Sequence, residues 1–296
     1  MERKRASDFH PEVLRLFDQY VHGLIDRRGF LERAAKFTVG GITATMLLDA
    51  LNPRFAEAQQ IAKDDPRLTT RSAEYDSPKG TGKVRGHLAI PAKHSGKLPG
   101  VLVVHENRGL NPHIEDIARR VALEQYVAFA PDALTPLGGY PGDEDKAREL
   151  FAKLDQPKTR EDFVAAVDWL AKRPECTGKV GVVGFCYGGG IANMLATRVP
   201  TLAAAVPFYG AQPPAEEVAK IKAPLLIHYA EKDERINAGI PAFEAALKAS
   251  HVKHEIYTYP GTQHGFNNDT TPRYDKDAAA LAWKRTMEFF KTNLRG

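Results

Sequence analysis

The stretch that decides the fold is Gly181-Val182-Val183-Gly184-Phe185-Cys186-Tyr187-Gly188-Gly189-Gly190. Its apolar part predicts a buried strand over residues 179–183, and the glycines that follow predict a sharp turn into a helix beginning near Gly188. Residues 184–188 match the nucleophile-elbow pattern G-x-S-x-G, with Cys186 in the place of the serine. The sequence therefore centres on one cysteine between a strand and a helix.

The glycines of this pattern have a physical purpose. A turn this tight exposes the nucleophile above the sheet only if the residues two before and two after it have almost no side chain. The following helix then directs its free N–H groups and positive dipole end at the sulfur, which favours thiolate over thiol. The alternative interpretation is that Cys186 is an ordinary buried cysteine beside a glycine-rich turn.

A carboxylate follows the next long apolar run. Residues 223–230 are typical of a parallel strand that is buried on both faces. The loop after them contains Asp233, the predicted catalytic acid, with Glu231 and Glu234 as alternatives in the same loop. This position agrees with the chain order of α/β-hydrolases, in which the acid lies between nucleophile and histidine.

A histidine completes that order. The predicted strand over residues 254–259 leads into a glycine-bearing loop with His264, ahead of a C-terminal helix. A single histidine in a loop is more often a solvated residue, but here three placements agree in order and in context. The sequence therefore predicts a triad of Cys186, Asp233 and His264.

Such a triad predicts nucleophilic catalysis by a thiolate. A free thiol has a pKa of about 8.5, so His264 would take its proton while Asp233 holds the imidazole in the right tautomer. The oxyanion formed by attack on a carbonyl needs preorganised donors. The predicted donors are the backbone N–H groups of Tyr187 and of Asn107, which follows a strand predicted over residues 100–104.

Four motifs together carry a family resemblance: Gly184-Phe185-Cys186-Tyr187-Gly188-Gly189, His105-Glu106-Asn107-Arg108-Gly109-Leu110, Ala130-Pro131-Asp132 and His264-Gly265-Phe266. Over residues 70–296 the chain resembles the dienelactone hydrolase family of cysteine α/β-hydrolases, also called carboxymethylenebutenolidases. The resemblance implies cleavage of a small carboxylic ester or lactone through a thioester. It also implies a role for Glu106, since the matching acid contacts the thiol and takes part in its activation. A solvated loop carboxylate is the alternative for Glu106.

The chain departs from the family at two positions. Family members that open dienelactones share two arginines that hold the substrate carboxylate, where this chain has Asn268 and Pro136. The resemblance therefore supports ester or lactone hydrolysis without supporting dienelactone as the substrate. Arg108 and Arg273 are the candidate replacement cations.

Aromatic residues near these motifs are candidates for substrate contact. The loop of residues 131–142 leaves a strand end that faces the predicted site, so we expect Tyr140 and Tyr187 to line the pocket. Phe266, in the His264-Gly265-Phe266 motif, is a third candidate for substrate contact. The alternative is that the loop of residues 131–142 is structural.

Composition sets limits on other functions. With 43% hydrophobic and 26% charged residues, the 296-residue chain is typical of a globular protein. The net charge of +4 comes without a basic stripe, so we expect no nucleic-acid partner. Metal-ligand spacings, a phosphate-binding loop and a dinucleotide fingerprint are missing from the sequence, and we expect no cofactor and no metal. Of the two cysteines, Cys176 is predicted to be a bystander.

The first 58 residues allow two interpretations. Residues 9–25 predict an amphipathic helix, after which Arg27-Arg28, an apolar run over residues 34–51 and Ala56-Glu57-Ala58 predict a twin-arginine export signal cleaved before Gln59. Export would place the protein in the periplasm or outside the cell. The alternative is a cytoplasmic protein with retained helices that dock on the domain or pair two copies. The run is too short and glycine-rich for a stable membrane span.

The sequence thus predicts three parts: an N-terminal helical segment or signal at residues 1–58, a linker at 59–70 and an α/β-hydrolase domain at 71–296. Strands are predicted over 71–75, 84–90 and 126–130, and helices over 114–125, 143–154 and 160–172. After the hairpin of the first two strands, strands and helices alternate, which predicts a mainly parallel sheet with helices on both faces. Two other functions remain open, a redox sensor that uses Cys186 and a non-catalytic binding scaffold.

Overall fold

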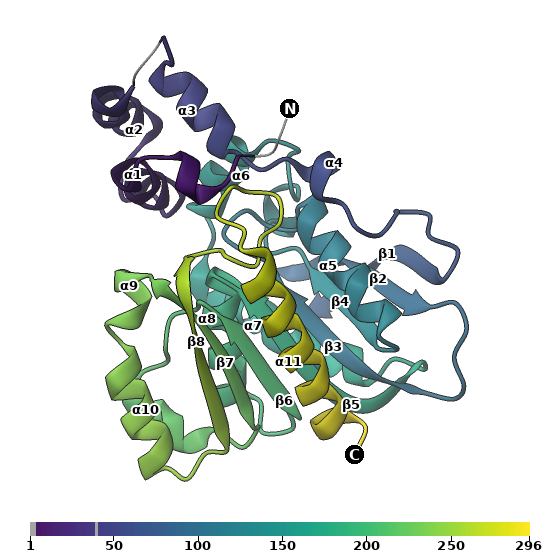
Figure 1. Ribbon diagram of the computed structural model, residues 1–296. Coiled ribbons are helices and arrows are strands. Elements are labelled where there is room, and N and C mark those ends of the chain that lie inside the picture. The colour runs from purple at the N-terminus through teal and green to yellow at the C-terminus, as the bar shows by residue number, and fades with distance from the viewer. Residues whose placement is uncertain (1–3, 39–40) are drawn as a thin grey trace.

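The computed structural model describes residues 4–38 and 41–296. Figure 1 shows one twisted sheet with helices on both faces and an N-terminal group of helices above one end of it. The strands are β1 Leu68–Ser77, β2 Gly82–Pro91, β3 Leu98–Val104, β4 Val127–Pro131, β5 Cys176–Phe185, β6 Ala204–Phe208, β7 Leu225–Lys232 and β8 His254–Gln263.

Helices alternate with the strands from β3 onward. The α-helices are α1 Pro11–Val21, α2 Arg27–Ala34, α3 Ala44–Leu51, α4 Phe55–Ala58, α5 Pro112–Leu123, α6 Glu144–Phe151, α7 Gln156–Ala171, α8 Tyr187–Arg198, α9 Glu234–Asn237, α10 Ile240–Ala249 and α11 Lys276–Leu294. Short 3-10 helices are η1 Ala6–Asp8, η2 Ala35–Phe37, η3 Thr135–Leu137 and η4 Ala215–Lys220.

The sheet is mainly parallel, as predicted. Its order is β1-β2-β4-β3-β5-β6-β7-β8. The first two strands form the predicted antiparallel hairpin, β2 pairs antiparallel with β4, and every pair from β4–β3 to β7–β8 is parallel. This is the mixed eight-stranded arrangement of an α/β-hydrolase fold, and the predicted fold class is confirmed.

The two faces of the sheet have separate cores because side chains alternate along each strand. In β5, Val180 and Val182 belong to a core that also contains side chains of α7, α8 and α10, whereas Val183 and Phe185 belong to a core with side chains of α5 and α11. The central strands are therefore apolar on both sides, which is why they read as continuous hydrophobic runs in the sequence.

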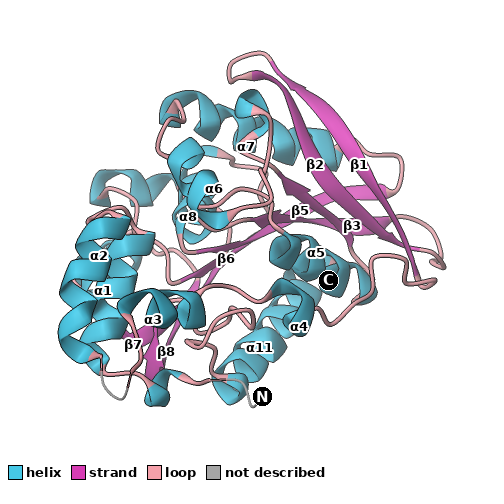
Figure 2. Cartoon of the chain, turned by 90° about the horizontal axis from the view of Figure 1, so that it is seen from above, coloured by secondary structure: helices cyan, strands magenta, loops and turns pink. Residues whose placement is uncertain are grey.

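Parallel strands bring their carboxyl ends to one edge of the sheet. The loops after β3, β5, β7 and β8 leave from this edge, and they carry Glu106, Cys186, Asp233 and His264. The edge faces α1, as Figure 2 shows from above. The topology thus gathers residues that are far apart in the sequence.

The N-terminal helices have a core of their own. Its buried side chains all come from residues 9–51 and include Phe17, Tyr20, Phe30 and Leu48. The helix predicted over residues 9–25 is shorter, since His10 caps its start and α1 ends at Val21. The run predicted over residues 34–51 is helical only in parts, and its residues 39–40 lie outside the described ranges. Every helix in those ranges is too short or too polar to cross a bilayer.

The chain after α4 is fixed to the domain. The backbone N–H groups of Gln60 and Ile61 donate to the carboxylate of Asp116 at 3.1 and 2.9 Å. Arg119 Nε donates to the carbonyl oxygen of Ile61 at 3.1 Å. Asp116 and Arg119 belong to α5, so the predicted linker is anchored at its beginning.

One strand and one core residue differ from expectation. The strand β6 was not among the predicted strands, because it is only five residues long and contains Pro207, which is uncommon inside a sheet. Phe266, predicted to contact substrate, is instead fully buried against Tyr209 and Tyr259 in the core beneath the site.

Candidate active site

Cys186 stands on the sharp turn between β5 and α8. Its backbone angles, φ of 56° and ψ of −113°, lie in a region that residues other than glycine rarely adopt. A Cβ on Gly184 would lie 2.0 Å from the carbonyl oxygen of Gly188, and a Cβ on Gly188 would lie 2.3 Å from that of Val104. The two glycines therefore allow the backbone contacts that hold the cysteine in this conformation.

The predicted acid and base lie together. His264 Nδ1 is 2.5 Å from Asp233 Oδ2, and both side chains are buried. Asp233 also caps α9, which fixes the carboxylate. The competing Glu231 is exposed and accepts from the backbone N–H of Gly261 at 2.8 Å. Of the three acids of this loop, Asp233 is thus the one on the imidazole.

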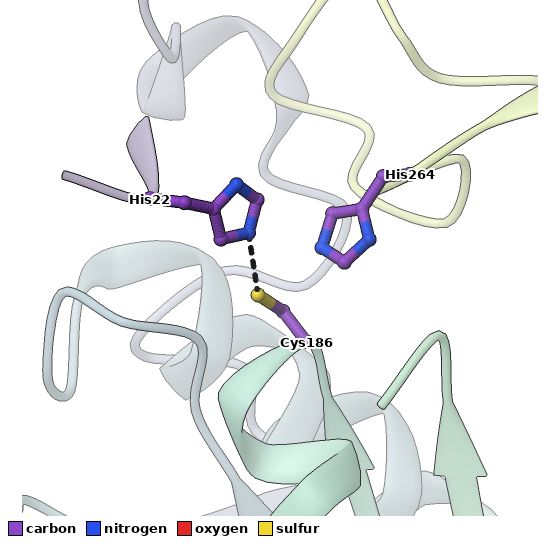
Figure 3. Close-up of side chains that lie close together, drawn as sticks. All are labelled: His22, Cys186 and His264. Carbon is purple, nitrogen blue, oxygen red and sulfur yellow. Dashed lines mark hydrogen bonds between the residues drawn. The ribbon is translucent and has the colours of Figure 1, made fainter. Parts of the chain in front are cut away.

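A second histidine reaches the sulfur from the N-terminal segment. His22 Nε2 lies 3.4 Å from Cys186 Sγ, and Figure 3 shows both imidazole rings beside the sulfur. One nitrogen of His22, one of His264 and the sulfur all lie within 4.8 Å of one another. His264 Nε2 is buried and makes no hydrogen bond with the described residues. These three side chains are also ligand types that zinc accepts.

His22 is held by its own carboxylate residue. Its Nδ1 lies 2.8 Å from the carbonyl oxygen of Asp18 and 3.2 Å from Asp18 Oδ1. Because a carbonyl oxygen only accepts, Nδ1 carries a hydrogen and Nε2 faces the sulfur. Arg235 Nη2 lies 3.1 Å from the same Nε2. No local motif marks His22 in the sequence, so His22 is not among the predicted site residues.

The electrostatics favour a thiolate. Burial by itself would raise the pKa of Cys186, but the positive charges of His264 and His22 outweigh burial and lower that pKa to about 6. Burial would conversely lower the pKa of each histidine. The thiolate, with Asp233 for His264 and Asp18 for His22, raises both pKa values instead. Sulfur and imidazoles thus stabilise each other's charged forms.

Glu106 borders the same small hollow as Cys186, and its hydrogen-bond partner is Asn268. Its Oε2 accepts a hydrogen bond from Asn268 Nδ2 at 2.7 Å, while Asn268 Oδ1 accepts from the backbone N–H of Thr270 at 3.0 Å. Asn268 is at one of the two positions where the family resemblance implied an arginine. In this chain that position supports the Glu106 carboxylate.

The two candidate replacement arginines bind the N-terminal segment. Arg108 Nη1 donates to the carbonyl oxygen of Val21 at 3.2 Å, and Asn107 Nδ2 donates to the same oxygen at 2.7 Å. Arg273 Nη1 pairs with Asp18 at 3.4 Å. These side chains hold the end of α1 over the site.

Of the two tyrosines predicted to line the pocket, Tyr187 does so and Tyr140 contacts a residue of the wall. Tyr187 lines the larger cavity described below, and its hydroxyl donates to Gln156 at 3.0 Å. Tyr140 donates to Glu144 at 2.9 Å and is not among the residues that line either cavity. Glu144 does line the smaller cavity, so Tyr140 positions a wall residue instead of forming the wall.

Two hollows meet at the sulfur. The smaller, about 40 Å³, lies under α1 and is lined by Glu106, Arg108, Arg273 and other polar residues. The larger, about 490 Å³, opens between α8 and the loop after β6 and is lined by Ile191, Met194, Pro213, Ile236, Arg160 and Arg235, among others. Cys186, His22, His264 and Asn107 border both hollows. The larger hollow has the size of a small-molecule site.

Comparison with known proteins agrees with this arrangement. The model of the dienelactone hydrolase family matches residues 84–294. The chain belongs to this family. A second model, described as YqhI-like, matches residues 1–36. The dienelactone hydrolase match covers the strands and loops that carry the elbow, the acid and the histidine, and it ends at the last residue of α11.

Individual relatives of the dienelactone hydrolase family support the same assignment. A "Putative carboxymethylenebutenolidase" from Saccharolobus solfataricus is 34% identical over 255 residues, which cover 73% of this chain and 96% of that one. The hydrolase fragment YghX of Escherichia coli is 55% identical over 114 residues, or 38% of this chain and 97% of its own. A crystal structure assigned as a dienelactone hydrolase from Klebsiella pneumoniae is 28% identical, with a TM-score of 0.66 over 75% of this chain and 98% of that one.

Proposed function

We propose that this member of the dienelactone hydrolase family cleaves a small carboxylic ester or lactone through a Cys186–His264–Asp233 triad and a thioester. The observation that carries the proposal is the 2.5 Å contact between Asp233 and His264 beside a cysteine on a strained elbow. A positioned acid, base and nucleophile in this order is the arrangement that nucleophilic hydrolysis needs.

The reaction follows from the roles of these groups. The Cys186 thiolate attacks the acyl carbon, and the carbonyl oxygen becomes an oxyanion. Tyr187 is the first residue of α8, so its backbone N–H has no partner within the helix and is a candidate oxyanion donor. The backbone N–H of Asn107 is the second candidate. His264 protonates the leaving alkoxide and then takes a proton from the water that hydrolyses the thioester.

The larger hollow suits the acyl part of such a substrate. Ile191, Met194 and Ile236 give it apolar walls, while Arg235 brings a cation close to the sulfur. Arg108 and Arg273 are engaged by the N-terminal segment, so Arg235 is the better candidate for a substrate carboxylate. The proposed substrate is therefore an ester or lactone that carries an acidic group.

Turnover of a panel of small esters and lactones, with and without a carboxylate and including dienelactone, tests this proposal. Wild type should turn over at least one, and Cys186→Ala should lose that activity by a factor of about a thousand or more. The exposed-loop variant His94→Gln is a control that should keep full activity. Equal activity of Cys186→Ala and wild type would refute the triad, and equal inertness would favour a redox or binding role.

A further inference from the structure

The N-terminal segment does more than cover the site, because it presents a histidine to the nucleophile in the same way as the domain does. His264 Nδ1 lies 2.5 Å from the Asp233 carboxylate, and His22 Nδ1 lies 2.8 Å from the carbonyl oxygen and 3.2 Å from the carboxylate of Asp18. Both turn their other nitrogen toward Cys186. In hydrolytic triads the carboxylate fixes the tautomer and stabilises the imidazolium. The cysteine thus stands between two carboxylate–histidine pairs.

We propose that Asp18 and His22 form a second catalytic pair, in which protonated His22 donates its Nε2 hydrogen to the Cys186 sulfur and stabilises the thiolate. This inference deepens the proposed function and rests on it for the chemistry of the substrate. His22 touches the reacting atom at 3.4 Å, whereas His264 Nε2 has no partner among the described residues and stays free for substrate and water.

The protons balance with this division of roles. The resting site holds a thiolate and two imidazolium ions. On attack a C–S bond forms, the C–O bond to the leaving group breaks, and the departing alkoxide takes the His264 proton. Water then attacks the thioester, gives a proton to neutral His264 and releases the thiolate. His22 keeps its proton throughout, so it lowers the energy of the sulfur anion both as nucleophile and as leaving group.

The charged groups around His22 determine whether its imidazole is protonated. Asp18 and the sulfur favour the imidazolium, while His264 and Arg235 bring positive charge against it. Arg273 also forms an ion pair with Asp18, at 3.4 Å. Arg235 can donate to Nε2 only while His22 is neutral, so this contact and the donation from Nε2 to the sulfur exclude each other.

The contacts of α1 are specific enough to hold His22 in place. Asn107 and Arg108 both donate to the carbonyl oxygen of Val21, the residue before His22. His22 itself is largely buried, with 12% of its side chain exposed. A group that is ordered and shielded from water in this way acts on a neighbouring charge with little screening.

Alkylation of Cys186 by iodoacetamide, followed by peptide mass spectrometry from pH 5 to pH 9, tests the proposal without any substrate. Only the thiolate reacts. In wild type the rate should rise with pH through a midpoint near 6, the pKa of Cys186. In His22→Gln and Asp18→Asn the midpoint should move up by about one unit, which lowers the rate at pH 6 by about fivefold. At pH 9 the rates should converge.

Matched controls separate chemistry from folding. His10→Asn keeps the cap of α1 and touches no atom of the site, so it should give the wild-type profile. Hydrogen exchange of α1 identifies the variants in which the segment stays docked. A wild-type alkylation profile in a docked His22→Gln or Asp18→Asn protein would overturn the proposal. Because the readout is alkylation, this result is independent of whether Cys186→Ala retains ester turnover.

Discussion

At the scale of single residues, the strained backbone of Cys186 depends on the absence of two side chains. The Cβ positions of Gly184 and Gly188 are occupied by backbone carbonyl groups of the opposing segments. Those groups belong to the elbow and to β3, so neither can move without disturbing the centre of the sheet. The strain is therefore maintained by packing around the turn instead of by the cysteine itself.

Replacing Gly184 with alanine should be among the most damaging changes in the domain. The added methyl group would lie 2.0 Å from the Gly188 oxygen, and we expect a loss of about 3 kcal/mol or more in the free energy of unfolding. Urea denaturation measures this loss. Gly190→Ala is the control, since its Cβ would have its nearest neighbour at 3.7 Å, and stability there should hold or rise. Equal stabilities would contradict the packing argument.

The residues of the site differ in how visible they are from sequence. Asp233 and His264 each follow a predicted strand, so the fold itself brings them to one edge, and their chain order indicates their roles. The partners of Arg273 and Asn268 could not be predicted in this way. Their side chains turn to Asp18 and Glu106, and such contacts depend on packing that one sequence does not encode locally.

At the scale of elements, α1 is the part whose role the sequence could not predict. The helix is amphipathic, and its apolar face predicts that it docks on another part of the protein. The contact between His22 and Cys186 could not be predicted, because the two residues are 164 positions apart along the chain. No spacing rule links positions that far apart. The parallel strands were predictable because hydrophobic runs and glycine turns act locally, whereas β6 was missed where a short strand contains proline.

The separate core of the N-terminal helices allows a test that does not touch the site. Phe30 is fully buried there, so Phe30→Ala should cost about 3–5 kcal/mol and loosen α1. With His22 withdrawn, alkylation of Cys186 at pH 6 should slow while hydrogen exchange in α1 and α2 accelerates. Met46→Ala is the control, because Met46 is 54% exposed and should leave both measurements unchanged. If hydrogen exchange in α1 became faster while alkylation of Cys186 kept its wild-type rate, α1 would have no role in activating the cysteine.

At the scale of the whole molecule, the two interpretations of residues 1–58 differ in whether the working enzyme still contains Asp18 and His22. Cleavage before Gln59, as the predicted export signal requires, would remove Asp18 and His22 together with α1. Retention would keep the second pair at the sulfur. The predicted export, and the predicted pairing of two copies through these helices, stay predictions.

Mass spectrometry of the intact enzyme isolated from its native cells distinguishes these interpretations. If the second pair is part of the working site, the active enzyme should retain residues 1–58, and fragments from that segment should appear in its mass spectrum. Fractionation of the same cells is the matching control for location. An active chain that begins at Gln59 would contradict a catalytic role for His22.

Because Gln60 and Ile61 are hydrogen-bonded to Asp116 of α5, only a short connecting segment separates the N-terminal helices from the domain. A tethered group returns to its target at an effective concentration set by the connecting chain, independent of how much protein is present. Completion of the site by His22 is therefore a first-order event. The specific activity should not fall when the enzyme is diluted, in contrast to a site that two copies must build together.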